Sequence, residues 1–222
     1  MARRLAKHVP ATPPERTLRV LDFGGGDGSL GRSVADALLS RRNQERIEVD
    51  VVDYQAVGAY STDRIAVAGF NDLGEITGPY DFVIASAILE HIPDVRDVIL
   101  RLLRSVRSGG GFYARTPWVL PLTTVVPNLD LTFPAHVHDM GALFWNRVPQ
   151  TFDMNVTYVF SRPSPVETSF RSNPFRSAAA TLLKIPALLE GALFAGATRD
   201  PFWHLVGGWE VMLLLDATHS EG

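Results

Sequence analysis

Strand-like and helix-like patterns alternate along the first half of the chain, and this alternation limits the fold more than any other feature. Apolar runs predict strands at residues 18–23, 47–53, 63–69, 80–86 and 112–116. Helical periodicity at 29–41 and 95–107 falls between these runs. An order of this kind predicts a mainly parallel sheet with helices on both faces.

The first expected strand ends in an acid and a glycine-rich loop, Asp22-Phe23-Gly24-Gly25-Gly26-Asp27-Gly28. Glycine lets the backbone turn sharply and approach a ligand closely, and Ser29 is a suitable cap for the helix that follows. The loop therefore indicates a cradle for a bound nucleoside.

Two other kinds of glycine-rich loop that bind nucleotides fit this sequence less well. The segment 26–31 satisfies the dinucleotide pattern G-x-G-x-x-G, but Asp22 and Asp27 would both repel a pyrophosphate. No Gly-Lys-Ser/Thr follows the glycines, which excludes a P-loop. A cationic or neutral ligand suits the acids better, although an NAD-dependent oxidoreductase stays open as an alternative.

Residues 22–28 resemble the D-x-G-x-G-x-G motif of class I S-adenosylmethionine-dependent methyltransferases, in particular small-molecule methyltransferases of types 11 and 12. Segments 49–53 and 80–86 look like the second and fourth strands of that family, and 89–94 and 102–110 follow in the expected order. The resemblance implies a Rossmann-like, doubly wound α/β fold. Its mainly parallel, seven-stranded sheet would have an antiparallel last strand.

The same resemblance implies S-adenosyl-L-methionine as the cofactor, bound where the strands end at their carboxyl edge. Asp53 is expected to accept hydrogen bonds from the ribose, Asn71 or Asp72 to meet the adenine amino group, and Phe70 or Tyr54 to pack on the ring. The predicted cofactor site comprises Asp22, Gly24, Gly25, Gly26, Gly28, Asp53, Tyr54, Phe70, Asn71, Asp72 and Ser86.

Three histidines are candidates for a general base, which a hydroxyl acceptor would need and a neutral amine would not. His91 follows the fourth family strand, and His136 and His138 lie after the fifth. The alternative is that they cap a helix or steady a loop. Some members of this fold bind a metal through E-x-x-E-H, but Ala87 stands where the first acid belongs, so no metal is predicted.

The expected reaction is methyl transfer by in-line displacement to a small-molecule acceptor, most simply an oxygen of a sugar, a natural product or a lipid-linked intermediate. A catalytically inactive protein that keeps the fold as a binding scaffold is the principal alternative.

Composition restricts the class of partner. The chain has 222 residues, a net charge of −3 and a pI near 6.1, which gives no broad basic field for nucleic acid. It has no cysteine, so disulfides and thiolate metal sites are excluded. These features fit a cytoplasmic protein, and no transmembrane span is expected.

The chain is expected to form one domain over 18–222, preceded by a flexible leader at 1–17. Residues 18–116 would form the cofactor-binding core and 117–222 the substrate side, where aromatic residues are candidates for an acceptor pocket. Beyond 150 the sequence predicts strand pieces at 155–160 and 166–170, a helical cap at 174–200 and a last strand at 208–216. The apolar cap also makes a homodimer or contact with a membrane surface possible.

Overall fold

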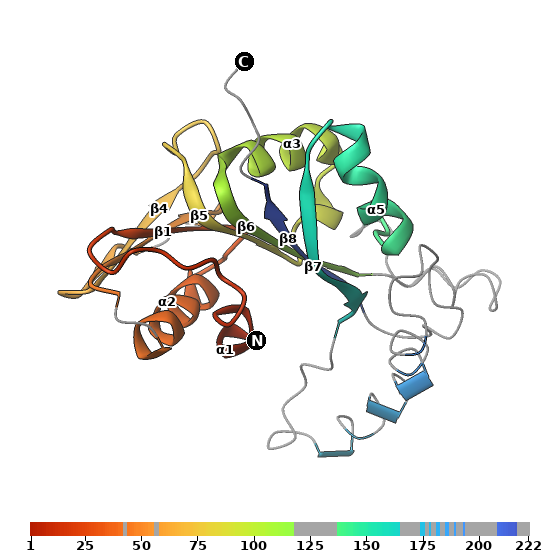
Figure 1. Cartoon of the computed structure of the whole chain (residues 1–222), viewed down its shortest axis with the longest axis horizontal. Helices are drawn as coiled ribbons and strands as arrows, with labels where there is room; N and C mark the ends of the chain where they lie inside the picture. Colours follow the sequence, from red (N-terminus) through yellow and green to blue (C-terminus); the bar gives the residue numbers. More distant parts are fainter. Residues whose placement is uncertain are drawn as a thin grey trace.

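The computed structural model describes residues 1–41, 44–55, 58–117, 137–164 and 208–216, together with nine single positions between 174 and 193. One eight-stranded sheet, in the order β3-β4-β2-β1-β5-β6-β8-β7, forms the centre of the molecule (Figure 1). Its strands are β1 (Leu18–Phe23), β2 (Ile47–Val52), β3 (Tyr60–Ser61), β4 (Ile65–Phe70), β5 (Tyr80–Ser86), β6 (Val106–Pro117), β7 (Val156–Pro163) and β8 (Gly208–Leu215). The helices are α1 (Ala2–Leu5), α2 (Ser29–Arg41), the 3-10 turn η1 (Leu89–His91), α3 (Val95–Ser105) and α5 (Ala142–Thr151).

The strand directions confirm the predicted fold class. β4, β2, β1, β5 and β6 are parallel, and β8 is antiparallel to both of its neighbours, β6 and β7. The prediction of seven strands missed β3, a two-residue strand antiparallel to β4. A strand this short carries too little alternation to be read from a sequence.

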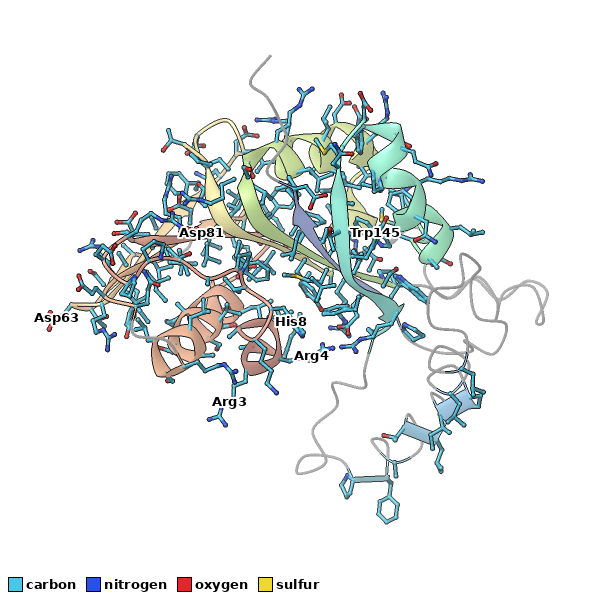
Figure 2. The ribbon with its side chains drawn as sticks, in the orientation of Figure 1. Arg3, Arg4, His8, Asp63, Asp81 and Trp145 are labelled. Carbon is cyan, nitrogen blue, oxygen red and sulfur yellow. The ribbon has the colours of Figure 1, made fainter. Side chains whose placement is uncertain are left out.

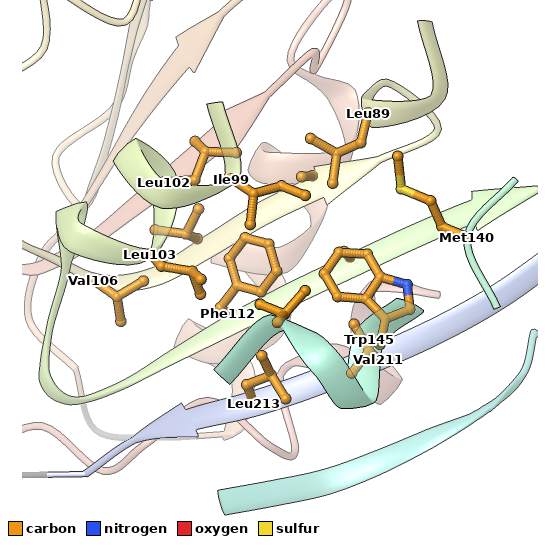
Figure 3. Close-up of a cluster of buried hydrophobic side chains, with 14 of the residues drawn as sticks. Leu89, Ile99, Leu102, Leu103, Val106, Phe112, Met140, Trp145, Val211 and Leu213 are labelled. Carbon is orange, nitrogen blue, oxygen red and sulfur yellow. The ribbon is translucent and has the colours of Figure 1, made fainter. Parts of the chain in front are cut away.

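Helices cover both faces of the sheet, and alternate residues of each strand serve the two faces. In β5, Val83 and Ala85 pack with α3 and α5, whereas Phe82 and Ile84 pack with α1 and α2. Figure 1 shows these helix pairs on opposite sides of the sheet. The larger cluster centres on Phe112 and the buried Trp145 (Figure 3). Burial on both faces explains why β1 and β5 read as continuous apolar runs.

The segment before β1 is packed against the sheet, so the prediction of a flexible leader is wrong for residues 1–9. Leu5 and Val9 are buried in the cluster that also holds α2. Arg4 lies on α1 (Figure 2), and its guanidinium donates to both carboxylate oxygens of the buried Glu210 on β8, one of them at 2.7 Å. A buried carboxylate needs such partners, and Arg162 Nε donates to it as well, at 2.9 Å.

The substrate side contains one helix that the sequence analysis did not predict. α5 places Trp145 at the centre of the core, although Pro149 lies inside the helix. β7 continues to Pro163, further than the predicted piece at 155–160, and the piece expected at 166–170 lies outside the described residues. Among the residues that the structure describes, no helix is long and apolar enough to cross a bilayer.

Candidate cofactor and active site

Four strand ends meet at the carboxyl edge of the sheet. The register pairs Phe23 with Val52 and with Ala85, and pairs Val52 with Phe70. The amide of Gly24 donates to the Val52 carbonyl at 2.8 Å, and this bond holds the start of the glycine loop at the end of β2. The residues predicted to bind the cofactor therefore gather at one edge, as expected for a doubly wound sheet.

The glycine loop needs its glycines for two different reasons. Gly24 has a φ of +69°, and a Cβ there would lie 2.3 Å from Cγ1 of Ile88, so the loop is pressed against the turn that follows β5. Gly26 has a φ of +57°, but a Cβ on it would meet no atom within 4 Å. Gly24 thus serves close packing, whereas Gly26 faces an open space that a ligand can fill.

Asp22 supports this loop from beneath. Its side chain is buried, and Oδ2 accepts a hydrogen bond from the Gly31 amide at 2.8 Å. A Cβ on Gly25 would lie 2.7 Å from the same oxygen. Although the sequence analysis placed Asp22 among the cofactor-binding residues, the structure has it joining the loop to the first turn of α2.

Burial raises the pKa of the Asp22 carboxyl from 3.8 to about 6, with a smaller contribution from the charge of Asp53. The native state then binds the proton more tightly than the unfolded state. The resulting stabilisation is complete below the unfolded pKa and is lost as the pH rises through about 6.

We therefore expect Asp22→Asn, whose amide oxygen can still accept the Gly31 hydrogen bond, to become more stable relative to the wild type as the pH rises from about 4 to about 7.5. The expected change in this difference is about 2 kcal/mol, measured as the free energy of unfolding in urea at both pH values. A difference that is the same at both pH values would show that Asp22 does not carry this proton.

Asp53 follows β2 and points its carboxylate at the loop. Oδ2 accepts the Gly26 amide at 2.8 Å and Oδ1 accepts the Gln55 amide at 2.9 Å, which leaves each oxygen able to accept a further hydrogen bond. Within the described part of the chain, neither Asp22 nor Asp53 forms an ion pair. A carboxylate with unused lone pairs beside the open space at Gly26 suits a cationic ligand that carries hydroxyl groups.

The remaining predicted cofactor residues lie around the same edge with different exposure. Tyr54 is 83% exposed beside Asp53, and Phe70 is partly buried against the core. Asn71 and Asp72 are exposed, and Asp72 accepts a hydrogen bond within its own turn. Ser86 is partly buried at the end of β5. The adenine contacts assigned to these side chains stay predictions.

The buried carboxylate of Glu90 lies next to His91 and was not among the site residues predicted from the sequence. Glu90 is only 2% exposed, and its Oε2 has no hydrogen-bond partner. Its Oε1 lies 4.0 Å from Nε2 of His91, whose side chain is 41% exposed. Burial raises the pKa of Glu90, and the nearby His91 and Arg115 partly oppose that shift. Adjacent Glu and His residues were visible in the sequence, but the burial of one and the exposure of the other were not.

His138 is held by the backbone. Its Nε2 lies 3.0 Å from the Ile92 carbonyl and 3.1 Å from the Pro93 carbonyl, so this nitrogen carries a proton and donates it. The Val137 amide donates to the Glu90 carbonyl at 2.8 Å, which fixes the same segment on η1. These contacts match the loop-steadying alternative for His138. His136 lies outside the described residues.

A hollow beside α5 contains two of the aromatic residues that were candidates for lining an acceptor pocket. Phe144 and Phe152 line a hollow of about 430 Å³ between α3 and α5, with Arg96 and Arg147 at its border. None of its lining residues belongs to the glycine loop or to the strand ends described above. The hollow therefore gives no support to these two aromatics as lining of an acceptor pocket next to the cofactor.

The sheet topology, the glycine loop and the Asp53 carboxylate at the end of β2 define a nucleoside-binding α/β protein suited to a positively charged ligand. The chain belongs to the methyltransferase domain family, which it matches over residues 1–158. It is a methyltransferase that depends on S-adenosylmethionine. The geometry fits this donor, because Gly26 borders an open space and Asp53 keeps free lone pairs beside it.

Solved methyltransferase structures share the fold at low sequence identity. Loganic acid methyltransferase with SAH has a TM-score of 0.61 and 10% identity, covering 99% of this chain and 92% of that one. An S-adenosylmethionine-dependent methyltransferase from Mesorhizobium loti gives 0.53 and 14%, covering 96% and 95%. Magnesium protoporphyrin IX methyltransferase from Synechocystis with bound SAH gives 0.54 and 14%, covering 96% and 78%. No curated protein sequence matches the chain significantly.

Proposed function

We propose that this methyltransferase acts on a hydroxyl oxygen of a small-molecule acceptor and that His91 takes the proton from that hydroxyl. The observation that carries the proposal is the pairing of the exposed His91 with the buried Glu90. The pair lies directly after β5, and the turn that holds it is in contact with Gly24 through Ile88.

S-adenosylmethionine, when bound, supplies a methyl group activated by the positive charge on its sulfur. Asp53 would accept hydrogen bonds from the ribose, and the backbone around Gly26 would lie against the nucleoside. The protein's remaining tasks are to align the acceptor oxygen with the methyl group and to exclude water. The protein performs both tasks by positioning the reactants. The remaining chemical step is the removal of the proton from the acceptor.

The Glu90–His91 pair is suited to removing this proton when the acceptor is a hydroxyl. As the oxygen–carbon bond forms, the hydroxyl proton moves to the neutral imidazole of His91, and the Glu90 carboxylate stabilises the imidazolium that results. Because Glu90 is buried, water screens this attraction little. An amine acceptor would lose its proton after transfer and would need no such pair. The presence of a base held next to a carboxylate therefore favours oxygen as the acceptor atom.

A donor labelled with ¹³C in its methyl group tests the acceptor atom. We expect the purified enzyme, incubated with the labelled donor and fractionated cell extract, to place the label in a low-molecular-weight product whose carbon spectrum shows a methoxy group. Extract without enzyme is the control. A product with an N-methyl or C-methyl carbon, or label confined to macromolecules, would contradict the proposal.

A further inference from the structure

The hollow between α3 and α5 takes no part in the proposed reaction. The two helices pack on the same face of the sheet (Figure 1), and the hollow between them has a volume of about 430 Å³. This volume lies within the range of pockets that bind small molecules. The side chains around the hollow therefore indicate what kind of ligand it can hold.

The floor of the hollow is apolar. On α5 and at its end, Phe144, Val148 and Phe152 recur every four positions, so they lie on one side of the helix. On α3, Val95 and Ile99 share a side in the same way. The three aliphatic residues are buried and the two phenylalanines are partly buried. We call these five residues the apolar floor. A ligand that covers the phenylalanines removes apolar surface from water, which favours a ligand with an apolar body.

The rim of the hollow is cationic. Arg147 and Thr151 lie one turn apart on α5, Arg96 lies on α3, and all three are exposed. The guanidinium carbon of Arg96 lies 5.8 Å from the centroid of the Phe152 ring, a cation–π contact that holds the charge above the apolar floor. Positive charge therefore borders the floor on both helices.

The charges of the two rim arginines are not neutralised by ion pairs in the described part of the chain, where neither Arg96 nor Arg147 has an acidic partner. The acids that follow them in the sequence, Asp97 and Asp153, are exposed and do not line the hollow. A guanidinium offers a fork of donors that fits an acidic group, and the Thr151 hydroxyl can donate as well. An acidic group at the rim would thus find donors there.

Charge distinguishes between possible occupants of the hollow. Both arginines would repel a cation, and a neutral apolar molecule would leave them without a counter-ion. In a symmetric contact between two copies of the chain the same surface meets itself, which would bring the two arginines of one copy against those of the other. An anion with an apolar body complements both the rim and the floor.

We infer that the hollow between α3 and α5 binds a small amphipathic anion, with its acidic group at the arginine rim and its apolar body on the apolar floor. The site is separate from the cofactor edge, since none of its lining residues belongs to the glycine loop or to the strand ends. The inference does not rest on the proposed function.

Isothermal titration of the full chain with sodium decanoate tests the inference. Decanoate is expected to bind, and saturation with the demethylated product of the donor is expected to leave its affinity unchanged. Hexanoate is expected to bind more weakly, by about fourfold for each methylene group that no longer covers the floor. Decyltrimethylammonium, which has the same chain length and a cationic head group, is expected not to bind.

The variant Arg96→Gln/Arg147→Gln removes the charge of the rim and is expected to weaken decanoate binding by about tenfold, as for the loss of two exposed ion pairs. The matched control is Arg101→Gln/Arg104→Gln, which makes the same change at two exposed arginines of α3 that do not line the hollow. The control is expected to bind decanoate as the wild type does. Titration with S-adenosylmethionine verifies that both variants are folded.

Four outcomes would overturn the inference: no binding of decanoate, equal loss of affinity in the two variants, tighter binding of decyltrimethylammonium than of decanoate, or competition between decanoate and the demethylated product. A homodimer in analytical ultracentrifugation that leaves decanoate unbound would assign the hollow to a second copy and would overturn it as well. Failure of the proposed methyl transfer would leave the decanoate result intact.

Discussion

Replacement of Asp53 by alanine is expected to weaken S-adenosylmethionine binding by about 10- to 100-fold. The carboxylate accepts the Gly26 and Gln55 amides and has lone pairs left for the ribose hydroxyls, and charge-assisted hydrogen bonds of this kind contribute about 1.5 to 3 kcal/mol. The variant also removes negative charge from beside a cationic ligand. Isothermal titration with the donor and with its demethylated product measures the effect.

Asp63→Ala is the matched control for this measurement. It removes the same charge from an exposed residue at the far end of the sheet (Figure 2), and the donor affinity is expected to stay unchanged. Asp53→Asn, which keeps one acceptor oxygen, is expected to fall between the two. If Asp53→Ala binds as tightly as Asp63→Ala, the ribose does not lie at the end of β2.

His91→Ala is expected to lower kcat by about 100- to 10,000-fold, the range typical of a lost general base. The donor affinity is expected to stay at the wild-type value, because His91 lies outside the predicted cofactor site. The acceptor identified by methyl labelling is the substrate for this assay. Normal turnover by His91→Ala would refute its role, and a loss of donor affinity equal to the loss of kcat would indicate structural damage.

Glu90 is assigned as a positioning residue that acts through His91, and a double-mutant cycle tests that assignment. Glu90→Gln is expected to lower kcat about tenfold, and the loss is expected to vanish in the His91→Ala background. Glu90→Asp, which keeps the charge, is expected to recover part of the rate. Additive effects would show that Glu90 serves only the structure. His138→Ala provides a comparison, since its Nε2 contacts are made with backbone carbonyls.

Strands buried on both faces made the parallel core predictable. β1, β2 and β5 begin and end within a residue of their predicted bounds, because apolar runs ended by acids or glycines leave little choice of boundary. The antiparallel β8 was predictable for the same reason. These strands fix where the glycine loop and Asp53 come together, so the gathering of the predicted cofactor residues at the carboxyl edge followed from the sequence.

Features that depend on distant partners were not predictable. Arg4 and three prolines before β1 suggested an unpacked segment, and only the tertiary structure shows that Glu210 lies opposite Arg4. α5 contains Pro149, which weakens a helical pattern, and its stability comes from burying Trp145. Asp22 fits the family motif as a binding residue, yet burial makes it a support for the loop.

The contact between Arg4 and Glu210 spans 206 residues of sequence. During synthesis on the ribosome, Arg4 emerges early, and its partner is made only when β8 is translated. The charge network under the sheet therefore forms late, and a nascent chain that lacks β8 leaves the β6 edge unpaired and Arg4 without this carboxylate. Completion of this contact thus waits for β8, which begins at Gly208, after all the parallel strands of the sheet have been made.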